Sequence, residues 1–284
     1  MDLIAANYAE SSEGESDSSS DLKVQVKNTQ EEEEGVAVLP SLPTEILDKF
    51  HIAPNISKFT NEMSLASNFT IKKGFYSSFI YLEWRPTKLY RQLVFKHIND
   101  YNLAFKELHN THSNQQFVPL HMNELGSPLP LHVSLSQNLI FHSEAQRDSM
   151  LTALQTRIST QNIPTFAIEF EPSPIILSSH LNNAMFLTYS VQEEFKKTVL
   201  KQIQDAIHES LKEAFPNRDI EKKYELENQS LHMSIAQMCN VPSYLMKHYH
   251  KSTVKPFQDF SLPTFQVDKI KCDKNREVFN IALL

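Results

Sequence analysis

Two short segments of this 284-residue chain share one pattern of side chains. They are Leu131-His-Val-Ser-Leu135 and Leu231-His-Met-Ser-Ile235. Because successive side chains of a β-strand face opposite sides of a sheet, each segment is predicted to be a strand. Its three apolar side chains would face a core, with the histidine and the serine side by side on the other face. The spacing, about one hundred residues, is too long for a solenoid repeat and indicates two related lobes.

The polar face of the first segment carries His132 and Ser134, and that of the second carries His232 and Ser234. Cleavage of an RNA phosphodiester by its own 2′-hydroxyl needs a base that takes the hydroxyl proton and an acid that protonates the departing 5′-oxygen. Histidine can do either near neutral pH. Serine hydroxyls can donate hydrogen bonds to the non-bridging phosphate oxygens. The four residues therefore predict an RNA phosphodiesterase whose scheme requires no metal ion.

Motifs of several other enzyme classes are missing from the chain. It has four glycines and no G-x-G-x-x-G or G-x-x-x-x-G-K-[ST] pattern, which argues against the Rossmann and P-loop classes. It has no G-x-S-x-G elbow for a Ser-His-Asp hydrolase, and no H-E-x-x-H or Cys/His cluster for zinc. We therefore predict neither a cofactor nor a metal site.

The acidic charge is concentrated at the start of the chain. Residues 1–35 carry ten Asp and Glu against two Lys, a charge of −8, so the net −7 leaves +1 for the rest. Residues 11–34 are rich in Ser and Glu and have too few apolar side chains to offset chain entropy. We predict a disordered tail at 1–35 and a folded domain at 36–284. A near-neutral body allows a small basic cleft for RNA but argues against a long nucleic-acid footprint.

The cysteines and the first residues indicate an intracellular protein. Cys239 and Cys272 form no C-x-x-C pair and are expected to be buried thiols in a reducing compartment. The start of the chain lacks the basic and apolar regions of a signal peptide, and no apolar stretch of about 18 residues could span a membrane. We expect a nuclear or cytosolic location and no membrane association.

Three longer helices are predicted from apolar periodicity and end signals. The first covers 87–109. The second begins at Ser143, where Ser-Glu-Ala-Gln forms a capping box, and the third runs from a second capping box, Ser190-Val-Gln-Glu193, to about Phe215. Their apolar positions include Leu89, Leu93, Ile98 and Phe105 in the first helix, Met150, Leu151, Leu154 and Ile158 in the second, and Phe195, Val199, Ile203, Ile207 and Leu211 in the third.

Short stretches rich in branched and aromatic residues between the helices predict strands. Together with the helices they predict an α+β domain in which sheet layers are covered by helices. The last two strands are expected to form a hairpin around the polar loop 273–276. The predicted strands lie near 79–84, 130–137, 165–170, 174–178, 184–189, 230–238, 265–272 and 277–283.

The paired His-x-Ser motifs resemble those of the 2H phosphoesterases. More narrowly, the chain is similar over about 75–284 to the family of U6 small nuclear RNA phosphodiesterases, which trim the 3′ oligouridine tail of that spliceosomal RNA. The stretches that carry the similarity are Leu131-His-Val-Ser-Leu-Ser136, Leu231-His-Met-Ser-Ile-Ala236, Met185-Phe-Leu-Thr-Tyr-Ser190 and Ile270-Lys-Cys272.

This resemblance implies a fold, a reaction and a set of site residues. The fold would be two pseudo-symmetric lobes of antiparallel sheet, covered by helices around a central groove. The reaction would be 3′–5′ exonucleolytic removal of terminal nucleotides by attack of the penultimate 2′-hydroxyl, leaving a 2′,3′-cyclic phosphate or a monophosphate derived from it. By analogy His232 is the general base and His132 the general acid, while the substrate-binding residues are Ser134, Ser234, Ser230 and Tyr224, the last stacking on a base.

The resemblance further implies a nuclear enzyme of RNA processing and mRNA splicing, with U6 RNA as its partner. Nothing in the sequence demands an oligomer, so we expect a monomer. Two other functions remain open at this point. One is a 2H cyclic phosphodiesterase that acts only on preformed 2′,3′-cyclic ends. The other is a non-catalytic RNA-binding module of the splicing machinery, to which the acidic tail would be better suited than to catalysis.

Overall fold

The computed structural model describes residues 46, 76–109, 115–179, 183–216, 231–248, 252–253, 261–274 and 277–284. All of them lie in the unit Leu42–Leu284, one of two units into which the chain divides. The predicted tail at 1–35 and the predicted boundary after it lie outside the described residues.

The elements of this part of the chain follow the predicted alternation of helices and strands. The helices are α3 (Lys88–His109), α4 (Glu144–Gln161), α5 (Glu193–Lys197), α6 (Val199–Ala214) and α8 (Ser243–His248). The strands are β1 (Tyr76–Trp84), β2 (Val118–Pro119), β3 (Leu131–Ser134), β4 (Leu139–Phe141), β5 (Phe166–Ile168), β6 (Ile175–Ser179), β7 (Ala184–Ser190), β8 (His232–Met238), β9 (Ser252–Thr253), β10 (Phe265–Val267), β11 (Lys269–Lys274) and β12 (Glu277–Ala282).

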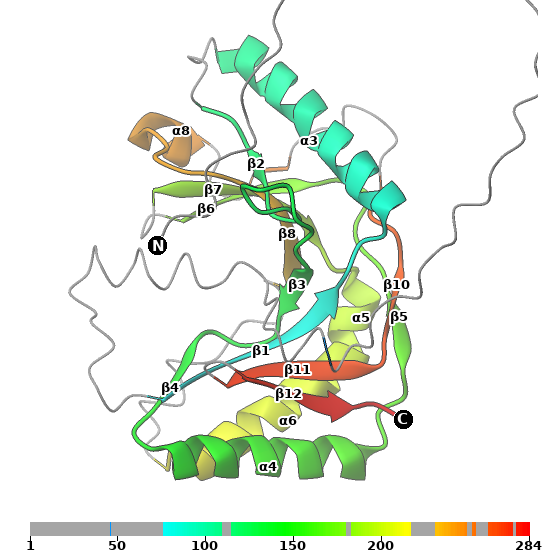
Figure 1. Cartoon of the computed structure of the whole chain (residues 1–284). Coiled ribbons are helices and arrows are strands. Elements are labelled where there is room, and N and C mark those ends of the chain that lie inside the picture. Colours follow the sequence, from blue (N-terminus) through cyan, green and yellow to red (C-terminus); the bar gives the residue numbers. More distant parts are fainter. Residues whose placement is uncertain are drawn as a thin grey trace, which may run out of the picture. The chain divides into compact units, whose positions relative to one another are not determined.

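One antiparallel sheet organises the described part of the domain. Its main order is β12-β11-β1-β3-β8-β7-β6-β9, with β4 paired to β1, β2 paired to β8, and a separate β5–β10 pair. Strands β3 and β8 lie in the middle, so the β1 half, containing β12, β11, β1 and β3, meets the β7 half, containing β8, β7, β6 and β9, at this pair (Figure 1). The predicted α+β class with two sheet halves is confirmed.

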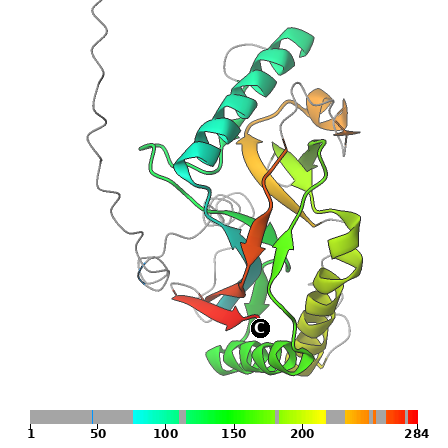
Figure 2. The same ribbon diagram turned by 90° about the vertical axis from the view of Figure 1, so that its right-hand side faces the viewer.

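The helices cover the two halves, and the chain crosses between the halves to place them. Helix α3 follows β1 but packs against the β7 half, where Nε2 of His97 lies 2.6 Å from the hydroxyl oxygen of Tyr189. Helix α6 follows β7 but lies beside α4, where the amide nitrogen of Gln146 donates to the carbonyl oxygen of Ala214 at 2.7 Å. Figures 1 and 2 show α3 and the α4–α6 pair at opposite ends of the sheet.

The predicted start and apolar stripe of α4 are confirmed. The Ser143 hydroxyl oxygen accepts a hydrogen bond from the backbone nitrogen of Gln146 at 3.1 Å, which satisfies one free donor of the first turn. The Gln146 side chain in turn accepts from the backbone nitrogen of His142, one residue before the cap. The stripe is buried at Met150, Leu151, Leu154 and Ile158.

The predicted third helix differs from the structure at its start. Ser190 is the last residue of β7, and its hydroxyl accepts a hydrogen bond from Nζ of Lys196 at 3.1 Å instead of capping the helix. The sheet explains this difference, because Ser190 pairs with His232 of β8 and is held in extended backbone. The helical segment then begins at Glu193 and is divided into α5 and α6 at Thr198.

Two further expectations need correction. In α3 the side chains of Leu89 and Leu93 are 62% and 41% exposed, because the face against the sheet is formed by Val94, Ile98, Tyr101 and Phe105. Of the two cysteines expected to be buried, Cys272 is buried in β11, and its burial raises the pKa of its thiol. Cys239 is exposed, since it follows directly after β8 at the turn where Asn240 has a φ of 53°.

Candidate active site

The two His-x-Ser strands are neighbours at the centre of the sheet. Strands β3 and β8 pair in the antiparallel sense with Val133 opposite Met233. This register sets His132 opposite Ser234 and Ser134 opposite His232, so the four side chains alternate in kind across the pair. Directly opposite residues on one face have Cβ atoms about 4.5–5.5 Å apart. The sheet therefore brings together the four residues predicted from the sequence, here called the tetrad.

Burial follows the predicted alternation of faces. The tetrad side chains are partly exposed. The apolar side chains between and beside them are at most 2% exposed; these are Leu131, Val133, Leu135, Leu231, Met233 and Ile235. One face of the central strand pair is thus core, and the other presents two imidazoles and two hydroxyls.

The two imidazoles interact electrostatically. Burial, and after it the positive charge of His232, lower the pKa of His132 to about 4. The register of β3 and β8 places the two histidines on neighbouring strands and on one face of the sheet, so the charge of one imidazole acts on the protonation of the other. At neutral pH His132 is therefore uncharged in the free protein, and its protonation opposes that of His232.

Aromatic rings of β1 enclose His132. Its ring lies edge-on to Phe79 at 5.6 Å and to Tyr81 at 6.0 Å between centroids, and these two rings stack on each other at 5.5 Å. The register of β1 and β3 sets Tyr81 opposite Ser134 and Glu83 opposite His132. The apolar ring faces supply part of the burial that lowers the pKa of His132.

A buried ion pair lies next to this aromatic cluster. Nζ of Lys271 in β11 lies 3.0 Å from Oε1 of Glu83, with the two side chains 2% and 7% exposed. Nε of Arg85 approaches the same carboxylate oxygen at 2.5 Å. One carboxylate opposite His132 thus holds two cations, so its charge is compensated within the protein.

On the other side of the tetrad, β7 contributes polar residues to the same face. Ser190 pairs with His232, and Thr188 pairs with Ser234. The Thr188 hydroxyl donates to the carbonyl oxygen of Ile175 at 3.1 Å. The Ser190 hydroxyl accepts from Lys196, as described above. The face opposite the core is therefore aromatic beside His132, at Phe79 and Tyr81, and polar beside His232, at Ser190 and Thr188.

Sequence reasoning did not identify the neighbours of the tetrad. Phe79, Tyr81, Glu83, Ser190 and Lys196 reach it only through the strand order and register. The alternation of side chains along β1 was a usable signal, because it places Phe79, Tyr81 and Glu83 on one face of this strand. Two predicted substrate-binding residues, Tyr224 and Ser230, lie outside the described residues, and their assignment stays a prediction.

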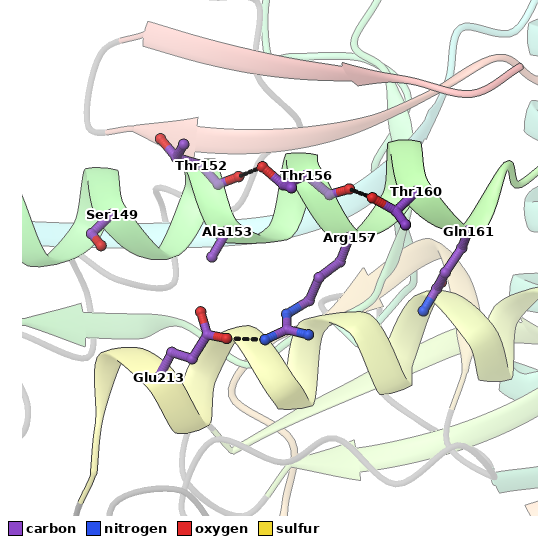
Figure 3. A pocket seen from close by; sticks show the side chains of 8 residues that line it. All are labelled: Ser149, Thr152, Ala153, Thr156, Arg157, Thr160, Gln161 and Glu213. Atoms are coloured by element: carbon purple, nitrogen blue, oxygen red, sulfur yellow. Dashed lines mark hydrogen bonds and ion pairs between the residues drawn. The ribbon is translucent and has the colours of Figure 1, made fainter.

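A hollow of about 690 Å³ lies on α4 beside α6 (Figure 3) and contains none of the tetrad. The hydroxyls of Thr156 and Thr160 donate to carbonyl oxygens of their own helix, and Arg157 forms an ion pair with Glu213. Apart from Nε of Arg157, these polar atoms already have partners within the protein, so the hollow offers little to a polar ligand. The tetrad is the better candidate for the active site.

Among the described residues, no group of three or more His, Cys, Asp and Glu side chains is arranged to hold a metal ion. None of the helices in this part of the chain combines the length and the apolar character needed to cross a membrane.

Two sheet halves joined at paired His-x-Ser strands are the arrangement that the resemblance to the 2H phosphoesterases implies. The chain belongs to the HVSL protein family, described as an uncharacterised conserved protein, whose model matches residues 40–282. The letters H-V-S-L occur in this chain at 132–135. The family and fold predicted from the sequence are confirmed.

Two solved structures share this fold. The structure of Kluyveromyces marxianus Usb1 is 18% identical, covers 75% of this chain and 100% of its own, and has a TM-score of 0.57. The structure of the same protein with uridine monophosphate is 17% identical, covers 73% of this chain and 98% of its own, and has a TM-score of 0.56. A search of curated proteins finds no match.

Proposed function

We propose that this protein is a metal-independent RNA phosphodiesterase that trims the 3′ oligouridine end of U6 small nuclear RNA in the nucleus, acting as a monomer. The observation that carries the proposal is the pairing of β3 with β8, which brings two histidines and two serines to one face of the sheet. A relative of the same fold in complex with uridine monophosphate supports a uridine-bearing substrate.

The reaction needs two proton transfers at one phosphorus atom. His232 takes the proton of the penultimate 2′-hydroxyl, whose oxygen then forms a bond to phosphorus. The bond from phosphorus to the 5′-oxygen of the terminal nucleoside breaks, and this oxygen receives a proton from His132. The products are a shortened RNA with a 2′,3′-cyclic phosphate and a released nucleoside. Ser134 and Ser234 donate hydrogen bonds to the non-bridging oxygens, whose charge changes during the reaction.

The lowered pKa of His132 bears on its role as the acid. In the free protein the group is neutral at physiological pH, because its pKa is about 4. A bound phosphate diester brings a negative charge beside the ring, which favours the imidazolium form. His132 therefore gains its proton together with the substrate. Binding of the phosphate thus prepares the general acid.

The experiment is incubation of the purified protein with 5′-labelled oligouridine-tailed RNA in excess EDTA, followed by mass analysis of the shortened 3′ end. We expect trimming one nucleotide at a time to a cyclic phosphate or a monophosphate, with a bell-shaped dependence on pH. Loss of activity on chelation contradicts the metal-independent scheme. Activity confined to preformed 2′,3′-cyclic ends indicates a cyclic phosphodiesterase, and binding without any cleavage indicates an RNA-binding module.

A further inference from the structure

Two lysines, Lys196 and Lys271, are buried in the described part of the chain, where every other lysine side chain with a described environment is at least partly exposed. Both bond to a residue that the sheet register sets opposite a tetrad histidine. Lys196 bonds to Ser190, which pairs with His232, and Lys271 bonds to Glu83, which pairs with His132. The tetrad thus has a buried ammonium group near each of its ends.

The burial of Lys196 is not explained by its ion pair with Glu193. The two charged atoms lie 2.9 Å apart, but the Glu193 side chain is 56% exposed. The next residue, Lys197, pairs with the same carboxylate at 3.7 Å while its own side chain is 74% exposed. Because pairing with Glu193 does not require burial, and burying an ammonium is costly, the inward position of Lys196 must serve another contact. That contact is Ser190, at 3.1 Å.

We propose that Lys196 is a positioning residue for His232 and acts through Ser190; the inference rests on the function proposed above. A serine oxygen has two lone pairs, and Lys196 occupies one of them. The other accepts the ring N–H of His232 across the strand pair. This contact fixes the tautomer, so that the bare nitrogen faces the 2′-hydroxyl. The nearby ammonium charge also disfavours the imidazolium form, which keeps the base neutral before reaction.

At the opposite end of the tetrad, a buried lysine again bonds to the residue opposite a histidine, but that residue is a carboxylate instead of a serine. There a carboxylate, Glu83, stands opposite His132, and the buried ammonium of Lys271 lies behind it at 3.0 Å. Because Lys271 and Arg85 compensate the charge of this carboxylate, it does not hold a proton on His132, which is neutral in the free protein. At the other end, a serine bonded to an ammonium favours a neutral imidazole, as the general base requires.

The variant that tests the inference is Lys196→Met, which keeps the apolar stem and removes the ammonium. The exposed Glu193 carboxylate stays in water, so the fold is expected to persist, which a thermal melt checks. Lys212→Met is the matched control, because Lys212 pairs with Glu209 at the same spacing of three residues, on the exposed face of α6. Lys196→Arg keeps the charge and tests rescue.

With U-tailed RNA, Lys196→Met is expected to lower kcat about tenfold or more, leave KM nearly unchanged, and move the acidic limb of the pH profile to higher pH. Lys196→Arg should restore part of the rate, and Lys212→Met should match the parent protein. Ser190→Ala should also lower kcat, but it leaves the ammonium in place and should move the acidic limb less than Lys196→Met does; the double variant should be no worse than the more severe single variant. An unchanged rate and profile in Lys196→Met overturns the inference.

A second readout separates this inference from the proposed function. Nitrogen-15 NMR of the imidazoles reports the tautomer and titration of His232 without any substrate. If the parent protein fails to cleave RNA, the proposed function fails, and the NMR signal still decides the role of Lys196. An altered tautomer balance or titration in Lys196→Met supports that role. Identical His232 signals in the two proteins overturn it, even if the variant has lost activity.

Discussion

Buried histidines make the stability of this fold sensitive to acid, and His97 allows the size of the effect to be worked out. This residue of α3 is 3% exposed, and its Nε2 lies 2.6 Å from the Tyr189 hydroxyl oxygen. Burial lowers its pKa from 6.5 to about 4, against a smaller opposing effect of Asp100. The unfolded chain therefore binds a proton at this position between about pH 6.5 and pH 4, whereas the folded chain does not.

Protonation of the unfolded chain at low pH therefore destabilises the fold. Because the pKa of His97 is lower in the folded state, its contribution to stability is fully present above about pH 6.5 and is lost as the pH falls toward about 4. From about pH 7.5 to about pH 5, His97 alone is expected to reduce the free energy of unfolding by about 2 kcal/mol. Below about pH 4 no further loss from this group is expected.

The assay is urea unfolding of the parent protein and of His97→Gln at several pH values. Glutamine can still bond to the Tyr189 hydroxyl but does not titrate, so the variant should lose about 2 kcal/mol less on acidification. His142→Gln is the control, because His142 is exposed. If the parent and His97→Gln show the same dependence on pH, His97 is not the buried neutral group described here.

Four further predictions concern the site. His132→Ala removes a proton-transfer group and is expected to lower kcat/KM about 10²–10⁴-fold, and Ser134→Ala about 10²-fold through a lost phosphate hydrogen bond; full activity of either variant on U-tailed RNA contradicts its role. Glu83→Gln leaves Lys271 buried without its carboxylate and should cost about 3–5 kcal/mol in urea unfolding, whereas Glu83→Gln with Lys271→Met should cost less; equal losses contradict the buried ion pair. Phe79→Leu opens the surroundings of His132 to water and should raise its pKa above about 4 in an NMR titration; an unchanged value assigns the burial to other groups.

The tetrad could be predicted from the sequence because its signal is local. Alternation of apolar and polar residues within five positions fixes which side chains share a face. Likewise, the capping residue Ser143 and the stripe from Met150 to Ile158 define α4 without reference to the rest of the chain. Both features depend on residues close together in the sequence, so no tertiary contact is needed to predict them.

The surroundings of the tetrad could not be predicted, because they depend on which strands become neighbours. Glu83 and Lys271 are 188 residues apart and meet only because β11 pairs with β1. Ser190 followed the pattern of a helix cap, but its pairing with β8 directs its hydroxyl to Lys196. For Ser190 the tertiary contact overrides the local preference. These are also the contacts that set the charge around the two histidines.

The central claim is that His132 and His232 act on one phosphorus atom. A crystal structure of this protein with uridine monophosphate tests it directly. We expect phosphate oxygens within hydrogen-bond distance, about 2.6–3.2 Å, of a ring nitrogen of both histidines, with the hydroxyls of Ser134 and Ser234 on the remaining oxygens. A phosphate that contacts only one imidazole, or that binds away from the face formed by β3 and β8, would contradict the account.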